Sequence, residues 1–157
     1  GNDFCSRFGV RRGISDTIYD ITAVNAIIGD IVNVFAEDYV VSAPVWDYFE
    51  STDKSDTAWA EGLKKEIHMD ILNGLVGKTA IHPSQLPVID EALTVSYETY
   101  KDACSLLNWN DSTLAVSKGT AGNRMNELAV HRNWADRILI RAAVYGIKEK
   151  ERITDIA

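Results

Sequence analysis

One stretch decides the fold of this chain: Gly77-Lys78-Thr79-Ala80-Ile81-His82-Pro83-Ser84-Gln85. Its first part, from Lys78 to His82, has the composition of a short strand. Pro83 suits the first turn of a following helix, where its missing N–H is not needed. The stretch is preceded by apolar residues at every fourth position, which predict a helix: Trp59, Leu63, Ile67, Ile71 and Leu75. On that helix Lys64, Lys65, Glu66 and Asp70 are expected to face elsewhere.

The rest of the chain repeats this alternation. Residues 1–15 have the pattern of a strand end followed by a loop rich in glycine and arginine, and apolar spacing predicts a helix up to about residue 36. Tyr39 to Ala43 is a short β-rich run that stops at Pro44. Further helices are expected after Ser96 and from about Asn123 to Tyr145, with a loop and a possible short strand between them. Alternating strands and helices predict an α/β fold with parallel strands.

Composition bounds the class of protein. The chain has 157 residues, of which 46% are hydrophobic and 25% charged, as in ordinary globular domains. A formal net charge of −7 argues against a nucleic-acid partner, and no apolar run is long enough to span a membrane. Cys5 and Cys104 show no metal-binding spacing, so a reduced, cytoplasmic setting is expected.

Several blocks together resemble one known family. Gly77 to Gln85 is similar to the last-strand signature of the citrate lyase β-subunit family, TIM-barrel carbon–carbon lyases that include the bacterial HpcH/HpaI-type proteins. Gly1-Asn2-Asp3-Phe4 resembles that family's Gly-x-Asp-Phe/Leu strand end. Three further blocks are similar to the family: Asp30 to Phe35, Pro44 to Phe49, and Arg124 to Glu127.

The resemblance implies an incomplete barrel. An eight-fold (β/α)8 barrel typically needs about 250 residues. Residues 1–108 are therefore expected to be the C-terminal portion of a TIM barrel, and residues 109–157 a loop and helical extension that packs on a neighbouring subunit. The missing N-terminal half would lie upstream or on a companion chain. The family also implies a homo-oligomer, a trimer or a hexamer.

The resemblance further implies a metal-assisted reaction. Asp3 would hold Mg²⁺, together with a glutamate from sequence upstream of Gly1. The ion would stabilise the enolate left when a C–C bond breaks in a carboxylate or acyl-CoA substrate. Asp47 lies just beyond the strand that ends at Pro44, where it can approach such a site.

Substrate contacts are expected from the loop Phe4 to Gly9, whose backbone amides can bind a carboxylate. Arg7, Arg11 and Arg12 can add positive charge there, although arginines in surface loops are usually solvated. His82 is expected near the site, either as a substrate contact or as a residue that fixes the turn before Pro83. Lys78 as a Schiff-base lysine is a weaker alternative.

The catalytic acid/base is expected at Glu127. The family's C-terminal segment carries an aspartate in this role, and Arg124-Met125-Asn126-Glu127 is similar to that segment. Arg124, Glu127 and His131 are spaced to share one helix face, which fits either an ion-paired interface or a site completed by a neighbouring subunit.

Two other functions stay open. The chain can be a barrel-derived biosynthetic or stress-operon protein that acts on another substrate, perhaps a phosphorylated one. It can also be a non-catalytic scaffold, because the glutamate expected to complete the metal site is not visible in the sequence.

Overall fold

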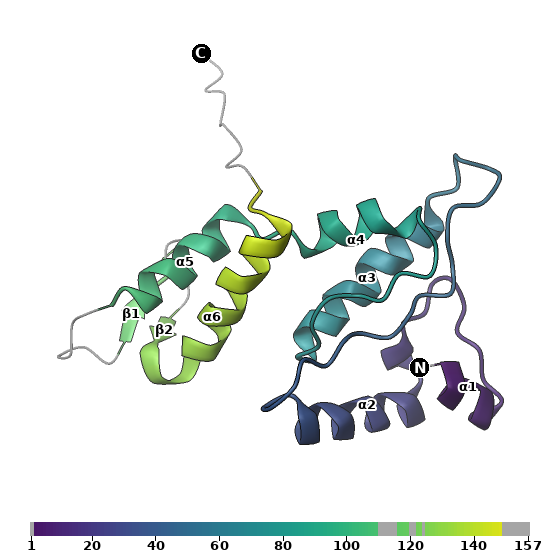
Figure 1. The fold of residues 1–157 in the computed structure, drawn as a ribbon, viewed down its shortest axis with the longest axis horizontal. Helices are drawn as coiled ribbons and strands as arrows, with labels where there is room; N and C mark the ends of the chain where they lie inside the picture. The colour runs from purple at the N-terminus through teal and green to yellow at the C-terminus, as the bar shows by residue number, and fades with distance from the viewer. Residues whose placement is uncertain (1, 110–115, 120–121, 124, 149–157) are drawn as a thin grey trace, which may run out of the picture. The chain divides into compact units, whose positions relative to one another are not determined.

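The computed structural model describes residues 2–109, 116–119, 122–123 and 125–148 (Figure 1). Contacts divide the chain into two compact units, Gly1–Ala92 and Leu93–Ala157. The first unit contains α1 (Asn2–Phe8), the 3-10 helix η1 (Ile18–Asp20), α2 (Thr22–Phe35) and α3 (Ala58–Leu72), and α4 (Gln85–Leu93) runs to its end. The second contains α5 (Tyr97–Leu107), β1 (Val116–Lys118), β2 (Met125–Glu127) and α6 (Leu128–Tyr145).

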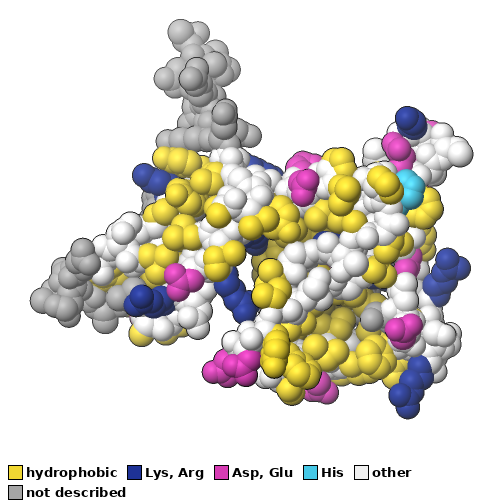
Figure 2. All heavy atoms as spheres, viewed as in Figure 1, with side chains coloured by type: hydrophobic (Ala, Val, Ile, Leu, Met, Phe, Trp, Pro, Cys, Tyr) yellow, Lys and Arg dark blue, Asp and Glu magenta, His cyan; other side chains and the backbone are white. Residues whose placement is uncertain are grey.

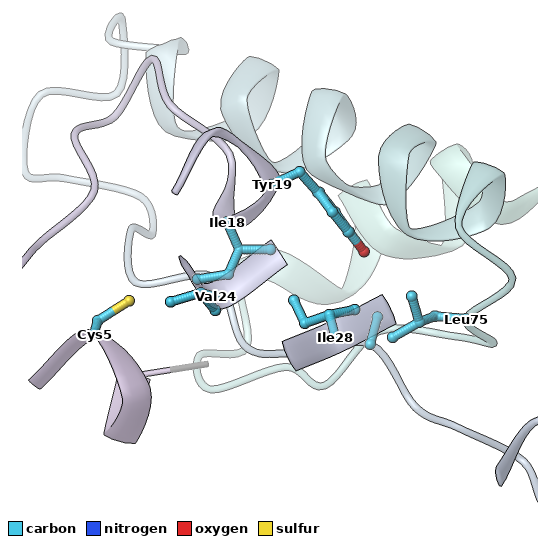
Figure 3. Close-up of a cluster of buried hydrophobic side chains, with 7 residues drawn as sticks. Cys5, Ile18, Tyr19, Val24, Ile28 and Leu75 are labelled. Atoms are coloured by element: carbon cyan, nitrogen blue, oxygen red, sulfur yellow. The ribbon is translucent and has the colours of Figure 1, made fainter. Parts of the chain in front are cut away.

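The core of the first unit joins five of its segments, because Ala43, between α2 and α3, also belongs to it. Figure 3 shows Cys5 of α1, Ile18 and Tyr19 of η1, Val24 and Ile28 of α2, and Leu75 after α3 meeting in one cluster. Because Val24 and Ile28 are four residues apart, they lie on one face of α2 and are buried together. The predicted helix before residue 36 is confirmed, with η1 as a separate turn ahead of it.

The helix α3 is also confirmed, and its apolar stripe is buried at Trp59, Leu63 and Ile67. Its first turn is capped by Asp56, whose Oδ1 accepts from the N–H of Ala58 at 3.0 Å. Gly74 follows with φ of +83°, a left-handed conformation that glycine adopts without strain. One expectation for α3 was wrong: Glu66 and Asp70 are buried, with exposed fractions of 0% and 1%.

The predicted strands do not form a sheet within the described part of the first unit. The runs Tyr39 to Ala43 and Lys78 to His82 contain no strand, and the nearest approach to one is an isolated parallel bridge between Ser42 and Val76. The N–H of Val76 donates to the carbonyl of Val41 at 2.9 Å. A strand is stabilised by partners on both edges, and these runs lack them among the described residues.

The N-terminal prediction was also wrong in structure. Asp3 lies in the first turn of helix α1, where a strand end was expected. Backbone bonds from Gly9 to Ser6 and from Val10 to Cys5 close the helix locally, and Gly9 adopts a φ of +66°. A carboxylate in the first turn is favourable to a helix because it faces the positive end of the helix dipole.

The second unit is built on the pair α5 and α6. Its core comprises Val95, Ala103, Leu106, Ala135, Ile138 and Ala142. Ser96 caps α5 as expected, accepting from the N–H of Thr99 at 3.2 Å. The last helix begins at Leu128, later than expected, because residues 125–127 pair antiparallel with β1. The predicted apolar patch Leu114-Ala115-Val116 lies mostly outside the described residues.

No helix in the described part of the chain has both the length and the apolar composition needed to cross a membrane.

Candidate functional site

An open pocket lies beside α1 in the first unit. Its volume is about 380 Å³. The lining side chains come from α1, from the loop that follows it and from the segment after Trp46: Asn2, Cys5, Ser6, Val10, Arg11, Arg12 and Asp47. Most of these side chains are polar or charged, so the pocket suits a polar ligand rather than an apolar one.

Asp47 is held in the pocket wall from two sides. Its Oδ1 accepts from Asn2 Nδ2 at 2.5 Å, and its Oδ2 accepts from two nitrogens of Arg12, at 3.1 and 3.2 Å. The carboxylate side chain keeps 22% of its surface exposed. The sequence predicted that Asp47 can approach the metal site, and the structure places its carboxylate against Asn2, the neighbour of Asp3 in sequence.

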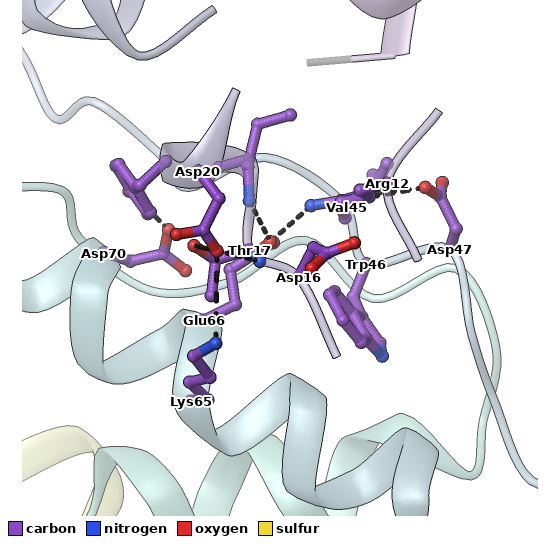
Figure 4. A network of polar contacts seen from close by, with 12 residues as sticks. Arg12, Asp16, Thr17, Asp20, Val45, Trp46, Asp47, Lys65, Glu66 and Asp70 are labelled. Carbon is purple, nitrogen blue, oxygen red and sulfur yellow. Dashed lines mark hydrogen bonds and ion pairs between the residues drawn. The ribbon is translucent and has the colours of Figure 1, made fainter. Parts of the chain in front are cut away.

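Arg12 stands behind Asp47 and is almost completely buried. Its guanidinium also pairs with Glu66, donates to the carbonyl of Val45 at 2.6 Å and lies 5.0 Å over the ring of Trp46 (Figure 4). The fixed fork of a guanidinium can meet several acceptors at once, which favours arginine at such a position.

A buried charge network continues from Arg12 into the unit. Glu66 accepts from the N–H of Ile18 at 2.8 Å and pairs with Lys78 at 2.6 Å. Lys78 also pairs with Asp70 at 2.9 Å, and Asp70 accepts from the hydroxyl of Tyr19 at 2.6 Å. Two buried cations thus face two buried carboxylates, which satisfies the rule that buried charges are paired.

Burial changes the acidity of two groups in this network. Desolvation raises the pKa of the Tyr19 hydroxyl far above its ordinary value, and its hydrogen bond to Asp70 raises it further. Desolvation also raises the pKa of Asp70, although the neighbouring Lys78 acts in the opposite direction. Tyr19 therefore acts as a hydrogen-bond donor to Asp70.

Sequence reasoning missed this network. Glu66 and Asp70 are spaced by four residues on α3, and the apolar stripe of that helix also follows a four-residue spacing. Partners outside the helix make burial of the two carboxylates possible: Lys78 pairs with both, and Arg12 also pairs with Glu66. The sequence held one signal: Lys78 follows Gly77, a residue that permits a sharp turn, shortly after α3 ends at Leu72.

The predicted N-terminal site residues lie on or next to α1. Asp3 and Arg7 are exposed, and Phe4 is partly buried against the core of the first unit. Gly9 is exposed in the turn that ends the helix. None of these four lines the pocket, although Asn2, Cys5 and Ser6 from the same helix do.

His82 is fixed by local contacts. Its ring stacks on Phe49 with centroids 4.4 Å apart, and its Nδ1 accepts from the N–H of Ser84 at 3.3 Å. Gln85 supports the same turn by accepting from the N–H of Ile81 at 2.9 Å. These contacts correspond to the turn-fixing role that the sequence allowed for His82.

Glu127 and His131 belong to the second unit. Glu127 ends β2 and is the residue before α6, so the expectation that it shares a helix face with His131 was wrong. The two residues still meet, because the N–H of Glu127 donates to His131 Nδ1 at 3.0 Å. Arg124, the third member of the predicted set, lies outside the described residues.

A metal site needs more ligands than the described residues bring together. In that part of the chain no three histidine, cysteine, aspartate or glutamate side chains converge on one point. The carboxylate of Asp3 is exposed and no described residue pairs with it, so it fits as one ligand of a hydrated ion. Glu66 and Asp70 do not fit, because buried cations already neutralise them.

The comparisons with known proteins define the class. The sequence profile of the carbon–carbon bond lyases of the TIM-barrel fold matches residues 1–147. The chain therefore belongs to this family of lyases. No match was found among curated proteins or among solved structures.

Proposed function

We propose that the chain works in a Mg²⁺-dependent carbon–carbon bond lyase of the citrate lyase β type. The substrate would be a carboxylate or an acyl-CoA thioester that is cleaved through an enolate. The observation that carries the proposal is the family match over residues 1–147, which includes the Gly-Lys-x-x-Ile-His-Pro stretch. A pocket lined by Asn2, Cys5 and Ser6, from the same helix as Asp3, supports the same class of reaction.

Asp3 is the proposed metal ligand of this chain. Mg²⁺ is commonly bound by one or two carboxylates together with waters, and the exposed carboxylate of Asp3, which pairs with none of the described residues, meets that need. When bound, the ion would polarise the substrate carbonyl and stabilise negative charge. The second carboxylate is proposed to come from sequence outside these 157 residues.

Substrate binding is proposed for the first turns of the chain. Arg7 is exposed and can attract a carboxylate, while Phe4 and Gly9 set the course of the backbone around it. His82 is proposed to border the same substrate. Glu127 of a neighbouring subunit is the proposed acid that returns a proton to the enolate, with His131 of that subunit beside it.

The site is proposed to be completed by further strands and subunits. The segment around the Ser42–Val76 bridge has open edges, and Val34, Phe35, Tyr39 and Val40 expose 47% to 77% of their surface nearby in sequence. Figure 2 shows apolar side chains gathered on the visible face of the molecule. Such exposed apolar surface favours a partner, either the first half of the barrel or a second copy of the chain.

The test combines mass and chemistry. The full chain is studied by native mass spectrometry with and without Mg²⁺, and exchange of the methyl protons of acetyl-CoA in D₂O is followed by NMR. Metal-dependent exchange supports the lyase. A folded protein that does not respond to Mg²⁺ and exchanges no proton would instead favour the scaffold. The observation that favours this alternative is that no three possible metal ligands converge among the described residues.

A further inference from the structure

The pocket presents one carboxylate in a fixed orientation. Asp47 keeps 22% of its side chain exposed, whereas Arg12 behind it keeps 1%. The Oδ2 atom of Asp47 faces Arg12, and its Oδ1 atom meets only Asn2 among the described contacts. A carboxylate oxygen has two acceptor sites, so Oδ1 retains a lone pair for a ligand.

Arg12 orients Asp47. Four of its five N–H donors are used by Asp47, Glu66 and the carbonyl of Val45. Glu66 is in turn fixed by Lys78 and by the N–H of Ile18. This chain of contacts anchors the pocket carboxylate to α3, a rigid element of the unit.

The other polar groups of the pocket are donors. Arg11 and Ser6 are exposed, and both line the pocket together with Asp47. Arg11 can pair with a carboxylate of a ligand, and Asp47 can accept a hydrogen bond from a hydroxyl. A ligand with one free carboxylate and one hydroxyl group fits both groups at once. Within the proposed lyase function, that ligand is a β-hydroxy acid, or the thioester of a β-hydroxy diacid whose second carboxylate stays free.

We propose, resting on the lyase function above, that Asp47 is the base that removes the proton from the substrate's β-hydroxyl group. The O–H bond breaks and its proton moves to Oδ1 of Asp47. The oxygen's electron pair forms a C=O bond, the bond between the α and β carbons breaks, and its electron pair remains on the α carbon as the enolate. Arg12 is the positioning residue, and Glu127 of a neighbouring subunit is the proposed acid that protonates the enolate. Buried Glu66 pairs with Arg12 and is itself paired with Lys78, so both residues help to hold Arg12 in place.

The experiment compares the rates of two reactions, both measured on the full chain in its native assembly with Mg²⁺. Exchange of acetyl-CoA methyl protons needs an enolate but no β-hydroxyl group. Cleavage of malyl-CoA to glyoxylate needs both. Asp47→Asn is expected to lower cleavage by roughly 100-fold or more, and exchange by less than about tenfold. Asp47→Glu keeps a carboxylate and should recover part of the cleavage.

Glu50→Gln is the matched control, because Glu50 is an exposed carboxylate in the same loop and does not line the pocket. It should leave both rates within about twofold of wild type, as exposed substitutions usually do. The assignment is overturned if Asp47→Asn cleaves within about tenfold of wild type, or if it loses exchange as deeply as cleavage. A wild-type protein that exchanges protons but cleaves no β-hydroxy thioester would overturn the base role alone. One that exchanges none would overturn the lyase proposal itself.

Discussion

Lys78 Nζ lies 2.6 Å from Glu66 Oε1 and 2.9 Å from Asp70 Oδ2, with all three side chains closed off from solvent. Lys78 follows α3 in sequence and turns back beneath it after Gly77. The lysine of the Gly-Lys-x-x-Ile-His-Pro stretch is therefore a counter-ion for two buried carboxylates. A Schiff-base lysine must be unprotonated and reachable by substrate, and Lys78 is buried and paired with two carboxylates.

Removal of this cation should destabilise the protein strongly. Lys78→Met leaves Glu66 and Asp70 buried without a cation between them, and loss of one partner of a buried pair costs about 3–5 kcal/mol. Urea titration of the full chain gives the free energy of unfolding of wild type and variant, and their difference is the loss of stability. Lys64→Met is the control, because Lys64 pairs with Glu91 at the surface, where such a pair contributes at most about 1 kcal/mol. Equal losses in the two variants would contradict the buried role.

Gly62 of α3 packs against Trp46, the residue before Asp47. A Cβ atom placed on Gly62 would lie 2.5 Å from Trp46 Cζ2 and 2.6 Å from the carbonyl oxygen of Ile14. We expect Gly62→Ala to cost about 1–3 kcal/mol through overpacking, measured as the midpoint shift in urea.

Gly29→Ala is the matched control for this substitution. Gly29 lies within α2, and a Cβ atom there would meet nothing within 4 Å. Alanine in an open helical position should raise stability by about 0.5–1 kcal/mol. A stabilising Gly62→Ala would show that the packing of Trp46 against α3 is wrong.

The turn before α2 gives a prediction for pH. Hydrogen bonds from the N–H and the hydroxyl of Thr17 lower the pKa of Asp20 below its ordinary value of 3.8. Because the folded-state pKa is the lower one, the stabilisation is present above pH 3.8 and disappears as the pH falls through the folded value.

Asp20→Asn should therefore lower the free energy of unfolding by about 1 kcal/mol at neutral pH, as loss of a capping contact does. The free energy of unfolding of this variant should also fall less steeply than that of the wild type as the pH is lowered. Stability is measured by urea titration from neutral pH down to acid. Asp30→Asn is the control, because Asp30 is an exposed carboxylate on α2. If the free energy of unfolding of both variants falls with decreasing pH as in the wild type, Thr17 does not bind the Asp20 carboxylate in solution.

Particular residues show how far the sequence could predict this structure. The stripe on α3 and the cap at Ser96 were predictable, because periodicity and capping act within a few residues of the chain. The burial of Glu66 was not, because it depends on Arg12, which is 54 positions away in sequence. The strand expected around Val41 failed for a related reason: a β-run needs partners that local sequence does not supply.

The candidate site shows the same division. The pattern around Asp3 identified the segment that borders the pocket, and Asp47 was placed near it. The pattern could not show that Asn2 and Arg12 hold Asp47, since hydrogen bonds between distant loops leave no periodic signal. Residues 2–8 form helix α1 where a strand end was expected. The hydrogen bonds of a helix are local, so α1 needs no neighbouring strand.

Gln85 links the stretch that decided the fold to the pocket. It is fully buried, its Nε2 donates to the carbonyls of Trp46 at 3.0 Å and Tyr48 at 2.8 Å, and its Oε1 accepts from Ile81.

Gln85→Leu keeps the side-chain volume but leaves these main-chain groups without their partner. The expected loss of stability is about 1–3 kcal/mol for each group that stays buried. Because Asp47 lies between the two carbonyls in sequence, the variant should also lower malyl-CoA cleavage more than it lowers acetyl-CoA exchange. Urea titration and the two assays measure these effects, and Asn33→Leu, at an exposed amide on α2, is the control. A Gln85→Leu protein with wild-type stability would mean that these carbonyls are satisfied by water, and that the stretch does not support the Asp47 loop.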